Sequence, residues 1–330
     1  MKKIPIILAL LLTAATTTSC TQDDILSFIN SVNPFEKQEN NENKTSNGDE
    51  ENGNQTGEEG GNGGEQGGNG GNQGGNGGTQ GGGGTVVPVD PGDYYEEVNN
   101  LEGEALLQGL RELNEKKRLR TVGYSTMGTS ASSPYKYTDY DPNTVQYDEK
   151  GQPYGTAVIS FYSGNSMTSF NKEHVWPNTH GGHLVEDDIH MPRPTIPSEN
   201  GARGHSFFIE GMKSKQNGGW DPAMEDFGRE DYRGDSARII FYCMIATDQL
   251  TLTDDGSRSS NTKNKEMGVI SDMLSWNLRY PVLEREQRRN SGAEYLQGNR
   301  NPFIDHPEYA CRIWGNHNDK TRQICSGGNR

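Results

Sequence analysis

The chain has 330 residues, and 19 of its 43 glycines lie between Gly48 and Gly84, where most other residues are Asn, Gln, Glu and Thr. Such a segment buries too little apolar surface to offset the entropy of ordering it, which excludes a folded domain there. The formal net charge of -15 does not exclude nucleic acid as a partner. Residues 101–330 hold 31 acidic and 27 basic side chains, so they carry only -4 of that charge.

The N-terminus is typical of an export signal: two lysines, an apolar stretch from Ile4 to Leu12 and small residues that lead to Cys20. Nine apolar residues are too few to span a bilayer, which needs about 20. The residues before Cys20 resemble the lipobox of bacterial lipoproteins. This resemblance implies a signal peptide at residues 1–19, lipidation of Cys20 and a lipid anchor at the outer membrane or cell surface. The alternative is a periplasmic or secreted protein without an anchor.

Residues 20–90 are expected to form a disordered, acidic tether rich in Gly, Asn, Gln and Glu, and residues 91–330 one folded domain. The first helix is predicted at residues 104–118, where leucines recur at helical spacing. Residues 156–164 are β-branched and aromatic and predict a strand, and a second short strand is expected at residues 172–176.

Apolar residues recur at helical spacing after Asp235 and again from Ile270 to Leu278, and a charged helix is expected at residues 283–290. Residues 177–233 show little periodicity and much Gly and Pro. A long irregular segment is uncommon in a compact domain unless it is functional. These features predict an α+β domain that is mainly helical.

Three cysteines remain after Cys20, so at least one of them is unpaired. Cys243 lies in an apolar helical run and is expected to be a buried thiol. Cys311 and Cys325 flank a polar segment that a short bridge could close, and their pairing is left open. The spacings contain no CxxC motif, which disfavours a thiolate zinc site.

The irregular middle of the chain holds four histidines: His174, His180, His183 and His190. They could form a zinc site, be unrelated surface or core residues, or include the base of a hydrolytic site. The third interpretation is favoured because Glu173 precedes His174 where a strand meets irregular chain, so both side chains can face one cavity.

Hydrolysis of a phosphodiester needs a base that deprotonates water and a divalent cation that neutralises the developing charge. A histidine and a neighbouring carboxylate supply these parts. Because a histidine base must be neutral, its ordinary pKa of about 6.5 predicts a preference for mildly alkaline pH.

Three blocks in the same region, FNKEHVWP (170–177), DDIHMPRPT (187–195) and ENGARG (199–204), resemble the endonuclease I family of bacterial periplasmic and secreted nucleases. The active site of this family is a ββα-metal, or His-Me, finger. The resemblance continues through YRGDSARIIFYCMIAT, WNLRYPVLEREQRRN and QGNRNPFIDHPEYACRIWG, and it covers about residues 94–315 in family order.

The resemblance implies a role for several residues. His174 matches the general base, and Glu173 and Asn200 match the two protein ligands of one metal ion, Mg²⁺ or in its place Mn²⁺ or Ca²⁺. Asp188 and His190 match a family Asp-Leu-His stretch, which implies that they support the finger. One ion with few protein ligands suits Mg²⁺, which keeps several of its waters.

Arg193 and Arg203 match positions where the family usually has arginine, and either could contact the substrate phosphate or form a structural salt bridge. Arg300 is a further candidate for contact with the substrate backbone. The chain departs from some relatives because residues 176–192 lack an Arg-bearing, Cys-rich insertion. A phosphate contact from that insertion is therefore missing.

The resemblance implies an exported, metal-dependent endonuclease that cuts DNA to 5′-phosphate products with little sequence preference, with RNA left open as a second substrate. The alternative is an inactive nucleic-acid-binding surface lipoprotein on the same scaffold. The intact Glu173, His174 and Asn200 favour the enzyme. The expected partners are nucleic acid and, through the lipid anchor, a membrane; no obligate protein partner is expected.

Overall fold

The computed structural model describes residues 92–130, 132–213, 218–256 and 265–327, all within the unit Gly83–Arg330. The predicted signal peptide, the lipidation site Cys20 and the tether at residues 20–90 lie outside the described residues. No helix in these four ranges is both long enough and apolar enough to cross a membrane.

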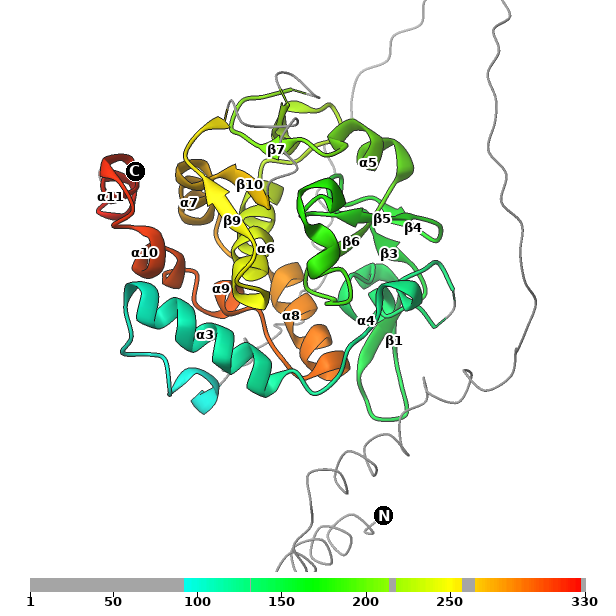
Figure 1. Ribbon diagram of the computed structural model, residues 1–330. Coiled ribbons are helices and arrows are strands. Elements are labelled where there is room, and N and C mark those ends of the chain that lie inside the picture. Colours follow the sequence, from blue (N-terminus) through cyan, green and yellow to red (C-terminus); the bar gives the residue numbers. More distant parts are fainter. Residues whose placement is uncertain (1–91, 131, 214–217, 257–264, 328–330) are drawn as a thin grey trace, which may run out of the picture. The chain divides into compact units, whose positions relative to one another are not determined.

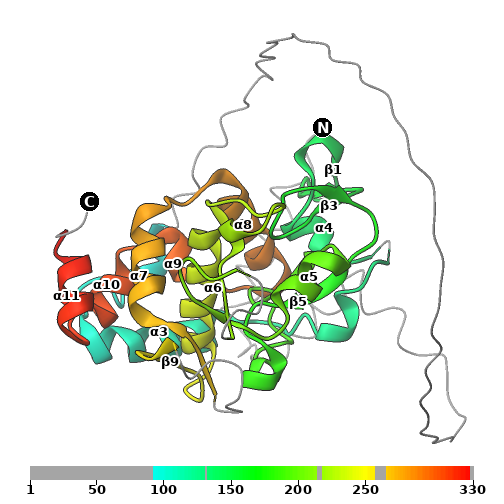
Figure 2. The ribbon, with the colours of Figure 1, turned by 90° about the horizontal axis from the view of Figure 1, so that it is seen from above.

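The longer helices pack around α6 (Tyr232–Ala246), in which every residue from Tyr232 to Ile245 is buried. α3 (Gly103–Lys117) and α7 (Ile270–Arg279) both contact α6, as Figures 1 and 2 show. α3 buries its leucines on one face because they recur at helical spacing. The remaining helices of the described residues are α4 (Tyr135–Thr138), α5 (Pro197–Arg203), α8 (Glu284–Gln297), α9 (Pro302–Asp305), α10 (Tyr309–Trp314) and α11 (Asp319–Cys325).

The strands of the described residues form two-stranded ladders and no larger sheet. The antiparallel ladders are β1 (Val145–Tyr147) with β2 (Pro153–Gly155), β3 (Val158–Ile159) with β4 (Ser166–Met167), and β5 (Asn171–His174) with β6 (Pro192–Thr195). The parallel ladders are β7 (Phe207–Phe208) with β8 (Gly219–Trp220), and β9 (Thr251–Thr253) with β10 (Glu266–Val269). Both ribbon views place β1 to β6 with α4 and α5 on one side of the unit and most of the longer helices on the other.

The mixed α+β class is confirmed, and so are helices at the positions that periodicity predicted. Leu278 is an exception on the α7 face, since it is 48% exposed. The strand predicted at residues 156–164 is wrong after Ile159. There the chain turns, with the Gly164 N–H donating to the Ser160 carbonyl at 2.9 Å, and it returns as β4.

The cysteines divide as a bridge and a free thiol. Cys311 and Cys325 are joined by a disulfide, which settles the pairing that the sequence left open. Cys243 is free and buried in α6, as predicted. The bridge connects α10 to α11, so it fixes the C-terminal helix to the helix before it.

Candidate active site

The residues of interest lie on a strand, strand, helix unit made by β5, β6 and α5. The antiparallel register pairs Asn171 with Thr195 and His174 with Pro192. After β6, Pro197 begins α5 in the first helical turn, where its missing N–H costs nothing. α5 contacts β5, so the helix lies against the strand that carries the Glu-His pair.

Glu173 is buried in β5, with 1% of its surface exposed. Its Oε1 accepts a hydrogen bond of 2.8 Å from the Tyr162 hydroxyl and lies 3.5 Å from Nε of Arg203. Burial raises the pKa of Glu173 to about 7, although Arg203 and the hydrogen bond from Tyr162 both act to lower it. A divalent cation at this carboxyl would favour its ionised form.

His174 is half-buried at the end of β5, and 14% of its side chain is exposed. Its Nε2 lies 3.0 Å from Oε2 of Glu186, and its Nδ1 lies 3.5 Å from the hydroxyl of Tyr124. Burial lowers the pKa of His174, while Glu186 acts to raise it. The ring is therefore neutral at neutral pH, as a base must be.

Asn200 lies in the middle of α5 and is half-buried. Its backbone N–H donates to the Ile196 carbonyl at 3.1 Å, and its own carbonyl accepts from the Gly204 N–H at 2.9 Å. No hydrogen bond between described residues uses its side-chain amide. An amide oxygen and a carboxylate are both hard oxygen ligands of the kind that Mg²⁺ and Ca²⁺ take.

The four histidines do not meet as the zinc interpretation required. His180 is buried with Nε2 3.1 Å from the His205 carbonyl, whereas His183 is exposed. In the part of the chain that the structure describes, no three His, Cys, Asp or Glu side chains gather as a metal site.

Asp188 and His190 connect the loop between β5 and β6 to the helices. Both are buried, and Asp188 accepts hydrogen bonds from the Tyr242 hydroxyl at 2.6 Å and from Nε2 of Gln297 at 2.7 Å. Nε2 of His190 lies 3.1 Å from the Asn299 carbonyl, and burial lowers the pKa of His190 to about 4. These contacts hold the loop against the helices, and the role of both residues as supports of a finger stays a prediction.

The three candidate arginines are buried in ion pairs or on backbone carbonyls. Nε of Arg193 donates to Asp139 at 2.8 Å, and Nη2 of Arg300 donates to Asp305 at 2.7 Å. Nη2 of Arg203 donates to the Val175 carbonyl at 2.7 Å, and this arginine is 0% exposed. Their placement favours structural roles. Contact with a phosphate stays a prediction that would require these pairs to open.

Comparison with known proteins identifies the family. A model of the Endonuclease I family matches residues 116–308, which is more than half of the chain. The chain belongs to the endonuclease I family. An extracellular ribonuclease of Bacillus amyloliquefaciens is 32% identical over 250 residues, covering 68% of this chain and 79% of the relative. An extracellular ribonuclease of Bacillus subtilis (strain 168) is 31% identical over 254 residues, which again cover 68% of this chain and 79% of the relative.

Membership in the endonuclease I family confirms the resemblance drawn from the sequence, and it makes the chain a nuclease that hydrolyses phosphodiester bonds. The matched residues include the whole β5, β6, α5 unit.

Sequence reasoning missed three residues that contact Glu173 or His174. Tyr162 contacts Glu173 from 11 residues before it, and Tyr124 contacts His174 from 50 residues before it; no local pattern marks either tyrosine. Glu186 was within reach of the sequence, because it is the first of three consecutive acidic residues that end at Asp188.

Proposed function

We propose that the chain is an exported, metal-dependent endonuclease of ββα-metal type, with His174 as general base and Glu173 and Asn200 as ligands of one Mg²⁺ or similar ion. One observation carries the proposal. His174, whose Nε2 lies 3.0 Å from Oε2 of Glu186, directly follows the buried Glu173 on β5. The helix α5, which contacts β5, carries Asn200. These are the parts that phosphodiester hydrolysis needs.

The donor set fits a hard divalent cation. Glu173 supplies a carboxylate and Asn200 an amide oxygen, and Mg²⁺ is satisfied with few protein oxygens because it keeps its waters. When bound, the ion supplies electrostatic stabilisation of the charge that develops on the phosphate. Since burial raises the pKa of Glu173 to about 7, the ligand form of this carboxyl is lost as pH falls below that value.

His174 is arranged to accept a proton. In the neutral ring Nε2 carries the hydrogen and donates a hydrogen bond of 3.0 Å to the carboxylate of Glu186. The free lone pair of the ring is then on Nδ1. Nδ1 is the nitrogen near the Tyr124 hydroxyl, and from there it takes a proton from the attacking water. The lowered pKa of His174 keeps this nitrogen unprotonated at neutral pH, and Glu186 stabilises the imidazolium that forms.

The substrate is nucleic acid cut with little sequence preference to 5′-phosphate products. The two relatives are named ribonucleases, which supports RNA as a substrate beside DNA. They are also named extracellular, which supports export of this chain. In this proposal, Cys20 carries the lipid anchor and residues 20–90 act as the tether of the catalytic domain at residues 91–330.

The test compares three variants with wild type on plasmid DNA and on RNA, in Mg²⁺ and in EDTA. His174→Ala should lose about 10² to 10⁴ in rate and keep Mg²⁺ and nucleic-acid binding, because a general base acts in the chemical step. Asn200→Ala should be partly rescued by higher Mg²⁺. The matched control is His183→Ala, an exposed histidine of the same segment, which should cleave normally.

Each role can fail separately. His174 is not the base if its alanine variant keeps more than about a tenth of wild-type activity. Equal rescue of His174→Ala and Asn200→Ala by Mg²⁺ would remove the distinction between base and ligand. Wild-type protein that binds nucleic acid in Mg²⁺ without cutting it would support the inactive binding protein instead.

A further inference from the structure

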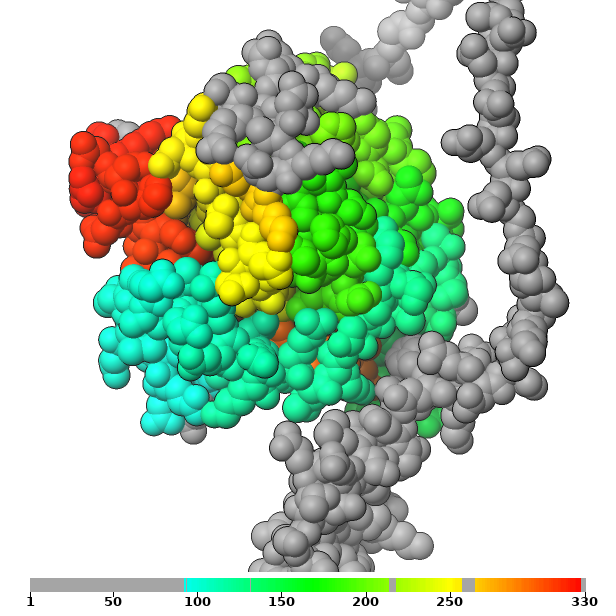
Figure 3. Space-filling view, in the orientation of Figure 1, coloured from blue at the N-terminus to red at the C-terminus, as the bar shows by residue number. Residues whose placement is uncertain are grey.

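A groove of about 560 Å³, lined by none of the residues assigned above, lies beside the C-terminal half of α3. It is bordered by α3, by the segment that follows this helix and by the residues at the end of α6. On the face drawn in Figure 3, the cyan surface of α3 and the yellow surface after α6 lie next to each other. Its basic lining residues are Arg111, Arg118 and Arg120.

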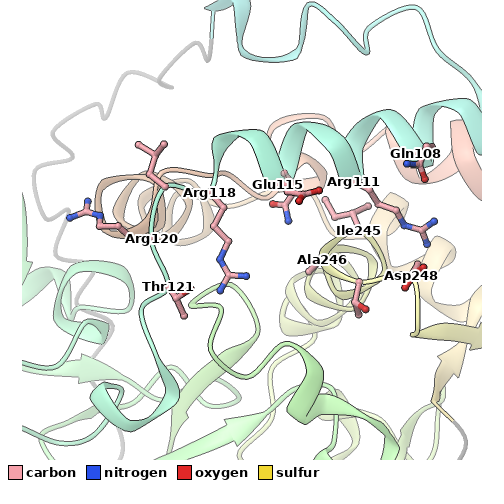
Figure 4. A pocket seen from close by; sticks show the side chains of 12 residues that line it. Gln108, Arg111, Glu115, Arg118, Arg120, Thr121, Ile245, Ala246 and Asp248 are labelled. Carbon is pink, nitrogen blue, oxygen red and sulfur yellow. The ribbon is translucent and has the colours of Figure 1, made fainter. Parts of the chain in front are cut away.

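These three arginines bond to backbone carbonyls and so keep donors free. Nε of Arg111 donates to the Met244 carbonyl at 3.2 Å, and Nη2 of Arg118 donates to the Asp187 carbonyl at 3.3 Å. Nη2 of Arg120 donates to the Tyr295 carbonyl at 2.9 Å. Each guanidinium has five N–H donors. Nε of Arg118 and Nε of Arg120 are buried, so the donors left for a ligand are Nη N–H groups. In Figure 4, Arg111 and Arg118 leave the same side of α3.

The contrast with the other arginines is what marks this groove. Among the described residues, Arg111 and Arg120 are the arginines that have no carboxylate within 4.0 Å. Arg118 lies 3.5 Å from the buried Asp188. Unpaired guanidinium groups suit a phosphate, which they can bind through two parallel N–H donors.

Two acidic residues, Glu115 and Asp248, also line the groove. Both are exposed, where salt screens their charges over about 8 Å, whereas the three arginines are half-buried and are screened less. The lining therefore holds three basic and two acidic groups, and the basic groups act more strongly on a ligand inside the groove.

The groove leads toward the candidate base. Asp187, whose carbonyl accepts from Arg118, also accepts from the backbone N–H of Tyr124 at 2.6 Å through its carboxylate. The Tyr124 hydroxyl lies 3.5 Å from His174, and Nζ of Lys172 lies 3.4 Å from the centre of the Tyr124 ring. Basic groups thus continue from the groove to the residues around His174.

We propose that this groove binds backbone phosphates of the substrate strand beyond the bond that is cut, with Arg111 and Arg120 as the phosphate contacts. The inference rests on the proposed nuclease function and adds the path of the strand. Arg118 directly follows α3 and lies seven residues after Arg111, so at 1.5 Å per residue these two lining residues lie about 10 Å apart along the helix axis. This exceeds the rise of about 3.4 Å per nucleotide along one strand of a duplex, so the groove holds more than one phosphate.

The experiment uses the full chain with Arg111→Gln, Arg120→Gln and both changes together. The matched control is Arg322→Gln, an exposed arginine of α11 that pairs with Asp319 outside the groove. Arg118 is left intact because it contacts the buried Asp188. Unfolding temperature is measured for each variant, so that a loss of fold is separated from a loss of binding.

The kinetic substrates are a single-stranded RNA of about 30 nucleotides, which is longer than the groove, and a dinucleotide with one phosphodiester. The double variant should raise KM for the long RNA about tenfold, with dinucleotide cleavage unchanged. Fluorescence anisotropy with the same RNA, in the Mg²⁺-bound His174→Ala background, should show the salt dependence of log Kd reduced by about 1.4, since each contact on a single strand contributes about 0.7.

An unchanged KM and an unchanged salt dependence would overturn the inference while leaving the nuclease intact. An equal loss on the dinucleotide would also overturn it, because the arginines would then act on the centre itself. If wild-type protein cuts neither substrate, the proposed function fails, and the anisotropy series still decides whether the groove binds the strand.

Discussion

The unfolding free energy of the metal-free Glu173→Gln variant, relative to that of wild type, should increase as pH rises. Burial raises the pKa of Glu173 to about 7, against an ordinary value of 4.5 in the unfolded chain. Between these two pH values the folded protein keeps the proton and the unfolded chain has lost it, so wild-type stability falls as pH rises. The difference between the two pKa values corresponds to a loss of about 3 kcal/mol in the unfolding free energy of wild type as pH rises. Gln does not titrate, so the variant does not show this loss.

The assay is urea unfolding of wild type and Glu173→Gln in EDTA, at several pH values from 4.5 to 8. Other titrating groups contribute equally to both proteins, among them His190 with its pKa of about 4, so the difference between the two profiles isolates Glu173. The free energy of unfolding of the variant, minus that of wild type, should grow by about 3 kcal/mol across this range. Mg²⁺ at pH 8 should stabilise wild type and leave the variant unchanged, because only a carboxylate attracts the ion strongly.

Parallel stability profiles for the two proteins in EDTA would refute this reasoning, since they would mean that Glu173 titrates alike in the folded and unfolded chains. Equal stabilisation of both proteins by Mg²⁺ would refute the metal-ligand role and leave the burial argument standing.

Three further changes have expected outcomes that denaturant unfolding can measure. Gly182→Ala should cost more than about 2 kcal/mol, because a Cβ there would lie 2.0 Å from a backbone oxygen; a cost near zero would contradict the turn as described. Arg203→Met should cost about 3 to 5 kcal/mol at pH 8, because it leaves the buried Glu173 without its cation, and a neutral result would mean that the pair does not form. Joint replacement of Cys311 and Cys325 by Ser should cost about 3 kcal/mol with activity per folded molecule retained, and equal stability would show that the bridge constrains nothing.

The sequence was sufficient to predict an element of the fold where the pattern of apolar residues is local. The apolar spacing in residues 104–118 predicts α3 to within a residue at each end, because a one-sided apolar face repeats every turn. It was insufficient at residues 156–164. There Phe161 and Tyr162 favour a strand by residue type, but Tyr162 instead turns its hydroxyl to Glu173. Tertiary contacts override strand propensity at such positions.

The residues of the candidate site also fall into those that a local sequence pattern reveals and those that only the fold brings together. Glu173 and His174 are adjacent in the chain, so a short pattern finds both. Tyr124, which lies 50 residues before His174, is brought to it only by the fold. The arginines were the least predictable, since residue type does not show whether a guanidinium already has a carboxylate. Arg193 and Arg300 proved to be paired, and the groove beside α3 was not foreseen.

The disulfide between Cys311 and Cys325 determines when the enzyme reaches its full stability. The cytosol keeps thiols reduced, so under the proposed export route this bridge forms only after the chain has left the cytosol. Under the proposed export route, the C-terminal helix is locked onto its neighbour in a compartment that does not contain the cell's own chromosome. By this route the newly made nuclease would be less stable in the cytosol, beside the chromosome, than in the compartment to which it is exported.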